Sequence, residues 1–168
     1  MDTPTKKYVW DLLSERFPEN AVPALMASID VETGGTFDYK QKQVGGGKGY
    51  GLLQFDFHRP YYNKWLSANK KKDSAEAQLD YLHDTLYGRN QDVIGKKTAK
   101  ELRMAIDSQD PGTLTQTLTD SLLRPGKPNM EKRLEAINKY AVFNPNPQVT
   151  PTNEVQGTVD YLKKMFGF

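Results

Sequence analysis

The chain has 168 residues, no cysteine and a formal net charge of +2. The length fits one domain with a sizeable core. The lack of cysteine excludes disulfides, thiol chemistry and cysteine-based metal sites. The small charge does not indicate nucleic acid as a partner, and no apolar run approaches the roughly 18 residues of a membrane span. The first residues lack the apolar centre of a signal peptide, so we expect another component to bring the protein to any cell wall.

Helical periodicity predicts two helices at the start of the chain. The first covers Thr3 to Phe17 and is ended by Pro18. The second follows Asn20 as its N-cap and ends at Gly34 and Gly35. Its apolar residues recur at intervals of three and four and line one face: Val22, Leu25, Met26 and Ile29.

Glu32 is the candidate for chemistry in this second helix. It follows Ile29 by three positions, so it should point with the buried face rather than into open water. It also lies in the last turn, where the helix dipole is negative. Both effects disfavour the ionised carboxylate, and a protonated carboxyl group is what a glycosidase uses to protonate a leaving oxygen. Helix geometry alone favours the plainer interpretation, a surface residue of the last turn.

The segment that follows makes it less favoured that Glu32 is only a surface residue of the last turn. Five of the thirteen glycines stand close together at 45, 46, 47, 49 and 51. Such a run usually marks a tight turn or a place where a ligand lies on the backbone. It leads into Tyr50 to Phe55, which we predict to be a short apolar strand with Gln54 as the polar side chain facing a cleft.

The pair Glu32-Thr33, followed after a loop by Gly51-Leu52-Leu53-Gln54-Phe55, resembles the phage tail lysozymes and more distantly the goose-type lysozymes and lytic transglycosylases. The resemblance covers about Tyr8 to Tyr140. It implies a predominantly helical α+β fold, lysozyme-like, with a small β-hairpin beside the cleft. It also implies cleavage of the β-1,4 bond between N-acetylmuramic acid and N-acetylglucosamine in peptidoglycan, by a phage lysin or a virion-associated lysozyme acting in the host periplasm.

Within this resemblance Glu32 is the catalytic acid. Gln54 and Tyr50 are expected to hold the sugar, and Thr33 either braces the glutamate or contacts the substrate. Asp38 and Asp56 are the candidates for a second carboxylate at the cleft, although turn and cap chemistry explains both more simply. A hydrolase needs such a second group, whereas a lytic transglycosylase uses one glutamate twice and forms a 1,6-anhydro sugar. Hydrolysis is the preferred hypothesis.

The rest of the chain predicts further helices. One follows Ser74 as its cap and ends near Gly88; others cover Thr98 to Ile106 and Pro111 to Leu123, and the last core helix follows Asn129. We expect a catalytic domain over residues 1–142, a linker rich in proline and asparagine over 143–152, and an amphipathic helix over 153–168 that could dock on other tail proteins.

Other kinds of site fit poorly. The glycine run lacks the residues of a phosphate loop, and neither His58 nor His83 has zinc-protease spacing. No cofactor or catalytic metal is therefore expected. A non-enzymatic wall-binding or tail-structural module remains as a rival of another class, against which Glu32 and the intact Gly-Leu-Leu-Gln segment both argue.

Overall fold

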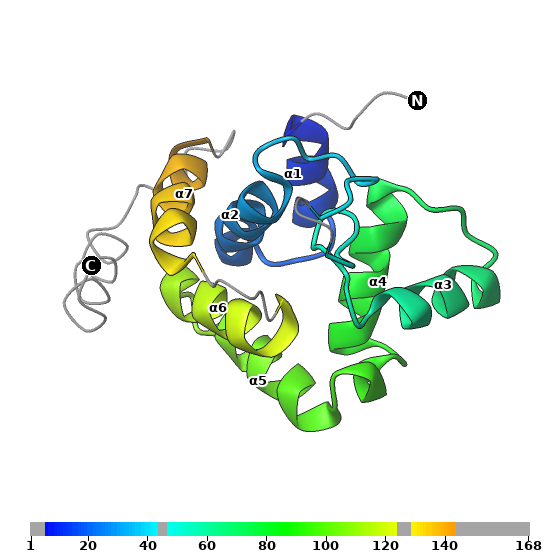
Figure 1. Ribbon diagram of the computed structural model, residues 1–168. Coiled ribbons are helices and arrows are strands. Elements are labelled where there is room, and N and C mark those ends of the chain that lie inside the picture. The colour runs from blue at the N-terminus through cyan, green and yellow to red at the C-terminus, as the bar shows by residue number, and fades with distance from the viewer. Residues whose placement is uncertain (1–5, 44–46, 124–128, 144–168) are drawn as a thin grey trace.

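The computed structural model describes residues 6–43, 47–123 and 129–143. These residues form seven α-helices (Figure 1): α1 (Lys6–Ser14), α2 (Val22–Thr33), α3 (Arg59–Ala68), α4 (Ala75–Tyr87), α5 (Lys96–Asp107), α6 (Pro111–Leu118) and α7 (Met130–Phe143). Shorter helical turns are η1 (Glu19–Ala21), η2 (Gln91–Val93) and the π-helical η3 (Thr119–Leu123). The predicted linker from residue 144 on and the predicted helix over 153–168 lie outside the described residues.

Helix α2 is the centre of the fold. Figure 1 shows it between α7 on one side and the segment that follows α2 on the other. The sequence predicts one buried face, but every residue from Val22 to Ile29 is buried. Small side chains such as Ala24, Ala27 and Ser28 separate the large ones and let neighbouring elements approach from all sides. The C-terminal end of this buried helix is therefore held firmly in place.

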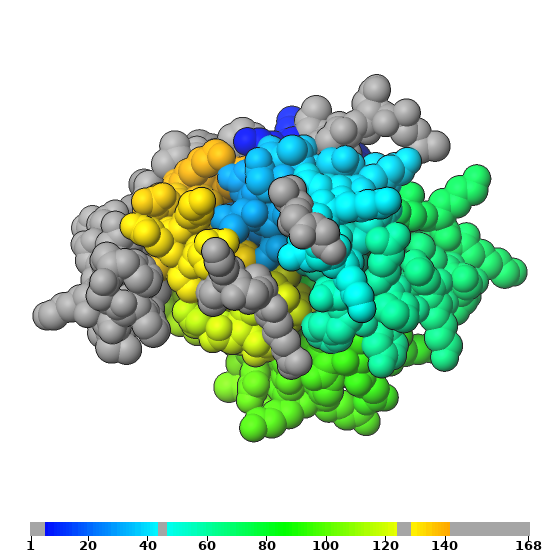
Figure 2. All heavy atoms as spheres, in the orientation of Figure 1, coloured from blue at the N-terminus to red at the C-terminus, as the bar shows by residue number. Residues whose placement is uncertain are grey.

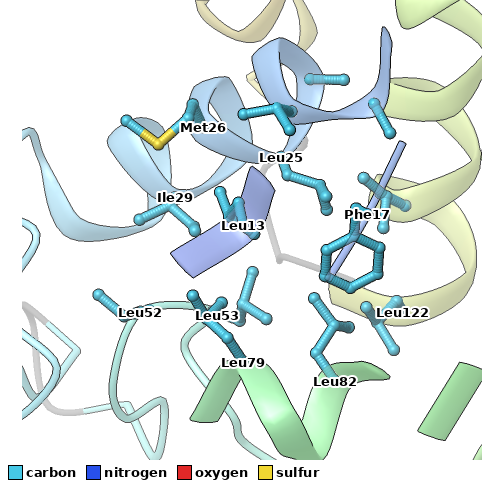
Figure 3. Packing of buried hydrophobic residues seen from close by; sticks show 14 of the residues in the cluster. Leu13, Phe17, Leu25, Met26, Ile29, Leu52, Leu53, Leu79, Leu82 and Leu122 are labelled. Carbon is cyan, nitrogen blue, oxygen red and sulfur yellow. The ribbon is translucent and has the colours of Figure 1, made fainter. Parts of the chain in front are cut away.

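The core joins α2 to helices that come much later in the chain. Side chains from α2, from α4 and from the turn at Leu52 and Leu53 point into one apolar centre, with Phe17 and Leu122 beside them (Figure 3). Leu25, Leu52 and Leu79 are fully buried. This packing places the end of α2 next to the glycine-rich segment, as the family resemblance requires.

Most helix ends follow the predicted signals. Gly34 ends α2 in the left-handed conformation at φ 59°, and the Ser74 hydroxyl caps α4 by accepting from Ala77 N at 3.1 Å. Asn20 does not cap α2, because η1 precedes the helix and the Asn20 amide donates to Ile106 O at 2.9 Å instead. The predicted helix over Pro111 to Leu123 changes to π geometry at Thr119.

The predicted strand over Tyr50 to Phe55 is wrong. Within the described residues the only strand-like pairing here is a single antiparallel bridge between Lys42 and Tyr50, so the small hairpin is not confirmed. The following residues make a tight turn, with Gly51 at φ 81° and Gln54 at φ 48°. Positive φ values cannot be accommodated in a regular strand. The apolar residues of this segment are nevertheless buried, because the turn lies under α4.

A charged cluster fixes α4 against the first helix. Asp80 accepts from Arg16 Nε at 2.7 Å and from Lys71 Nζ at 2.5 Å. Burial raises the pKa of Asp80, but the two cationic partners outweigh it and hold the pKa of this carboxyl below its ordinary value. Within the described residues, every helix is too short or too polar to span a bilayer.

Candidate active site at the end of helix α2

The Glu32 side chain lies in the last turn of α2 and is only 11% exposed. The predicted inward orientation is therefore confirmed. In Figure 2 the blue surface of α2 lies between α7, in yellow and orange, and the cyan segment that carries the glycine-rich turn. Glu32 thus lies at a helix end between α7 and the segment that carries the glycine-rich turn.

Arg133 of α7 is the partner of Glu32, and the sequence analysis did not identify it. Its Nη2 atom donates to Glu32 Oε1 at 2.5 Å, and its side chain is 1% exposed. The contact joins the end of α2 to α7. The interaction is a charge-assisted hydrogen bond, which is among the stronger polar contacts in proteins.

The position of Arg133 was visible in the helical pattern. It shares one face of α7 with Ile137 and Tyr140, at intervals of four and three, and both of these are 1% exposed. A buried arginine requires an acidic partner. The pattern indicates that such a partner exists, but it does not say which of the chain's acids this is.

A second ion pair also joins α2 to α7. Lys139 Nζ donates to Asp30 Oδ2 at 2.8 Å. Tyr140 lies beside the same acid, and burial together with the Asp30 carboxylate raises the pKa of its hydroxyl above the ordinary value. Asp30 and Glu32, two residues apart, are thus both held by cations of α7.

Thr33 has a structural role. It is fully buried; its hydroxyl donates to Ile29 O at 2.7 Å and accepts from Phe37 N at 3.2 Å. A side chain without exposed surface cannot contact a sugar, which corrects the predicted substrate contact. The bonds of Thr33 tie the loop after α2 to the end of the helix, so they support the alternative role of bracing the turn that carries Glu32.

Gln54 has an unusual backbone and an unusual side chain. Its φ of 48° is rare outside glycine, and such strain concentrates at functional sites. The side-chain amide donates to Gly51 O at 2.9 Å. Its Oε1 atom is buried without a hydrogen-bond partner among the described residues. A buried acceptor without a partner is unusual in a native structure, and Gln54 as a whole remains half-buried.

Gln78 of α4 holds this turn in place. It is fully buried, its Oε1 accepts from Leu52 N at 2.8 Å, and its Nε2 donates to Tyr39 O at 2.7 Å. A methyl group on Gly51 would lie 2.3 Å from Gln78 Oε1. Glycine is therefore required at position 51 both for its positive φ and for the close approach of this amide.

Tyr50 is fixed by a carboxylate that the sequence analysis did not consider. Its hydroxyl donates to Asp73, which also accepts from Tyr62 at 2.7 Å. Burial, followed by the hydrogen bond to Asp73, raises the pKa of Tyr50 above its ordinary value. The Arg59 guanidinium lies 3.7 Å from the centre of the Tyr50 ring. With its hydroxyl and one ring face engaged, Tyr50 offers a sugar at most its remaining surface.

The two candidates for a second carboxylate are engaged elsewhere. Asp38 Oδ1 accepts from Lys40 N at 2.9 Å, which makes it a turn-forming residue. Asp56 is exposed and lines a hollow of about 530 Å³ together with Arg59 and Lys48. The described contacts of both acids are with their own loops and not with Glu32. The turn chemistry weighed at the sequence level therefore explains Asp38.

The described residues contain no metal centre: across 6–43, 47–123 and 129–143, no three His, Asp or Glu side chains come together as ligands. What the arrangement offers is acid chemistry. One oriented carboxyl group lies at the end of α2, and a strained glutamine turn lies in the segment that follows.

Comparison with known proteins identifies a family for this chain. A family model described as phage tail lysozyme matches residues 4–143, which include Glu32, Arg133 and the turn from Gly51 to Gln54. Neither the curated proteins nor the solved structures gave a significant match. The family indicates a lysozyme-like glycosidase that acts on peptidoglycan in a phage context. Because the match spans most of the chain, this protein belongs to the phage tail lysozyme family.

Proposed function

We propose that the protein is a muramidase that cleaves the β-1,4 bond between N-acetylmuramic acid and N-acetylglucosamine, with Glu32 as the general acid. The observation that carries this proposal is the Glu32 carboxyl group itself. It is 11% exposed and held at 2.5 Å by a buried arginine, at the end of the central helix. Fixed orientation of the proton donor toward the leaving oxygen is what such an acid requires.

Arg133 has two consequences for this role. It contacts Oε1 of Glu32, which leaves Oε2 to carry the proton and face the glycosidic oxygen. Once the proton has moved to the leaving group, Glu32 is a carboxylate, and the adjacent guanidinium stabilises that charge. Arg133 is thus a positioning residue that also stabilises the carboxylate left after the proton transfer.

Gln54 is the proposed sugar contact. Gln54 is half-buried, so the exposed part of its side chain would contact the substrate, and Gln78 keeps the surrounding turn rigid. Tyr50 contributes through its free ring edge. Asp56 remains a candidate contact at the rim of its basic hollow, where Arg59 and Lys48 keep it among cations.

Among the described residues no second acid is evident beside Glu32. A lytic transglycosylase therefore remains the alternative. In a hydrolase, carboxyl groups about 5 Å apart would indicate a retaining enzyme and roughly 6.5–9.5 Å an inverting one. Mass spectrometry of digested peptidoglycan decides between the two reactions. Reducing muramic ends are expected from hydrolysis, whereas 1,6-anhydro ends would establish transglycosylation.

The test of Glu32 is a turbidity assay on bacterial cell walls with Glu32→Gln. Loss of a general acid typically lowers the rate by about 10²–10⁴-fold. Glu135→Gln is the matched control, since Glu135 is an exposed residue of α7 and the chemical change is the same. Equal lysis by wild type and Glu32→Gln would reject the assignment. Absence of lysis by the wild type would instead favour a non-catalytic wall-binding or tail-structural module.

The family places this activity in a phage context. We propose that the protein acts on the host wall from the virion or from within the infected cell. The catalytic domain over residues 1–142 and the docking of residues 153–168 on other tail proteins belong to this proposal. Deletion of residues 144–168 tests the docking: wall lysis by the purified enzyme should persist while incorporation into virions is lost.

A further inference from the structure

A hollow of about 460 Å³ lies between α3 and the end of α4. Its volume falls in the range of small-molecule sites in proteins. One wall comes from α3, and the other comes from the end of α4 and the residues up to η2. Among the described residues that line it, none belongs to α2, to α7 or to the turn that carries Gln54. Figure 1 shows α3 on the side of the molecule away from α7, so the hollow is separate from Glu32 and its partner.

The α3 wall of the hollow is aromatic. Tyr61 and Trp65 both line it, and because they are four residues apart they share one face of the helix. Trp65 is only 8% exposed, whereas Tyr61 is 51% exposed. An exposed tyrosine beside a hollow offers a ligand an apolar ring and a hydroxyl group. This wall therefore suits a ligand that has one apolar face.

The opposite wall is built around Asp84. Its Oδ2 atom accepts from Trp65 Nε1 at 2.8 Å and from Asn90 Nδ2 at 3.0 Å, and its Oδ1 atom accepts from Arg89 N at 3.2 Å. A Cβ atom on Gly88 would overlap Asp84 Oδ1, so glycine lets the chain fold closely around this carboxylate. The bonds fix the two walls relative to each other without a ligand. Such preorganisation lowers the cost of binding.

The charges of the hollow balance. Lys64 and Arg89 line it together with Asp84 and Asp92, which gives two cations and two acids. An ionic ligand is therefore not favoured. The amide of Asn90 and the carboxylates can exchange hydrogen bonds with hydroxyl and N-acetyl groups. The opposite wall thus suits an uncharged ligand with a polar edge.

We infer that this hollow binds an N-acetylated saccharide of the wall glycan at a second site, apart from the cleavage at Glu32. A pyranose ring has a face of C–H groups, which fits Tyr61, and an edge of hydroxyl and acetamido groups, which fits the polar side chains of the opposite wall. The site retains the enzyme on the glycan between cleavage events. It goes beyond the proposed function, and only the choice of N-acetylated glycan as its ligand rests on that function.

Nuclear magnetic resonance of the full chain titrated with N,N′-diacetylchitobiose tests the inference. This disaccharide lacks the bond of the proposed cleavage, so it is not a substrate of that reaction. The chain has two tryptophans, and Trp10 of α1 is 4% exposed and does not line the hollow. The indole N–H signal of Trp65 should therefore shift until the site is saturated, while that of Trp10 stays in place. Tyr61→Ala should weaken binding about fivefold through loss of the ring, and Tyr61→Phe should retain most of the wild-type affinity.

Tyr8→Ala is the matched control, because it makes the same change at a 45% exposed position of α1 and should leave the affinity unchanged. A Trp65 signal that does not move would overturn the inference, and so would equal movement of both indole signals. Tyr61→Ala binding as tightly as the wild type, or no more weakly than Tyr8→Ala, would overturn it as well. These results do not depend on catalysis. Inactivity of the wild type on cell walls, or full activity of Glu32→Gln, would instead reject the proposed function.

Discussion

The ion pair between Glu32 and Arg133 leads to a prediction in which variants of the pair lose stability and activity to different extents. Arg133 is 1% exposed and Glu32 11%. Glu32→Gln removes the carboxylate that a deeply buried guanidinium contacts. Arg133→Met leaves a carboxylate that lies nearer to water and can turn toward it. Glu32→Gln should therefore be the more destabilising change, although in most proteins an acid near the surface tolerates this substitution well.

The magnitude follows from the burial of the pair. Removal of one partner from a buried ion pair costs about 3–5 kcal/mol. Since Glu32 retains some contact with solvent, we expect about 3 kcal/mol for Glu32→Gln and about 1–2 kcal/mol for Arg133→Met. At about 2–4 °C per kcal/mol for a chain of this size, Glu32→Gln should lower Tm by roughly 6–12 °C. The double variant replaces both charges and should lie within about 1 kcal/mol of the wild type.

Urea denaturation of the four proteins gives the coupling energy, and turbidity assays on the same samples give the activity. The double variant should be nearly as stable as the wild type and as inactive as Glu32→Gln. That combination separates loss of chemistry from loss of fold. Strictly additive effects on the free energy of unfolding would refute the reasoning. So would a Glu32→Gln variant as stable as the wild type, because either result would mean that the contact contributes nothing to the fold.

Three further predictions concern the frame of the site. Gly51→Ala should lower the free energy of unfolding by about 3 kcal/mol in urea denaturation, since its methyl group would lie 2.3 Å from Gln78. Gly34→Ala has no atom within 4 Å of its added methyl group, so it should lower the free energy of unfolding only by the roughly 1–2 kcal/mol of a left-handed residue. Asp80→Asn should cost about 1 kcal/mol at pH 7. Because folding lowers the pKa of Asp80, its contribution exists above the unfolded pKa of about 3.9 and is lost as pH falls through the lower folded value. The difference in stability between the two proteins should therefore shrink as pH falls below about 3.9. Ser74→Ala should lower the free energy of unfolding by about 1 kcal/mol through loss of the α4 cap.

Each of these three predictions has a result that would contradict it. Equal costs for the two glycine substitutions would mean that the turn yields to the added methyl group. A stability difference for Asp80→Asn that stays constant as pH falls below about 3.9 would mean that its contribution is not ionic. Ser67→Ala, at an exposed position of α3, is the control for the cap and should stay within about 0.5 kcal/mol of the wild type.

The helices were predictable because their signals are local. Apolar residues at intervals of three and four place α2 and α4 to α7 close to their observed bounds, and Ser74 and Gly34 mark real helix ends. The strand over Tyr50 to Phe55 failed for a local reason as well. Aromatic and apolar content favours a strand, but the positive φ values at Gly51 and Gln54 require a turn. Composition alone does not distinguish a buried strand from a buried turn.

The site was predictable only in part. The position of Glu32 in its helix was enough to predict that it points inward, because residues of one helix have a fixed angular relation. Its partner Arg133 lies 101 residues away in the sequence, and only the tertiary packing of α2 against α7 brings the two together. For Thr33 the same helix periodicity left two roles open. Its complete burial then excluded the sugar contact.

The residues proposed for chemistry and the residues that hold them come from different parts of the chain. Glu32 and Gln54 lie within one short segment, whereas Arg133, Gln78 and Asp73 fix that segment from later in the chain. A mutation in one of these supports would therefore lower activity without touching the sugar, since misplacement by about 1 Å can cost 10²-fold in rate. The segment alone therefore supports a hypothesis about the acid, whereas the distant supports set the geometry in which that acid would meet its substrate.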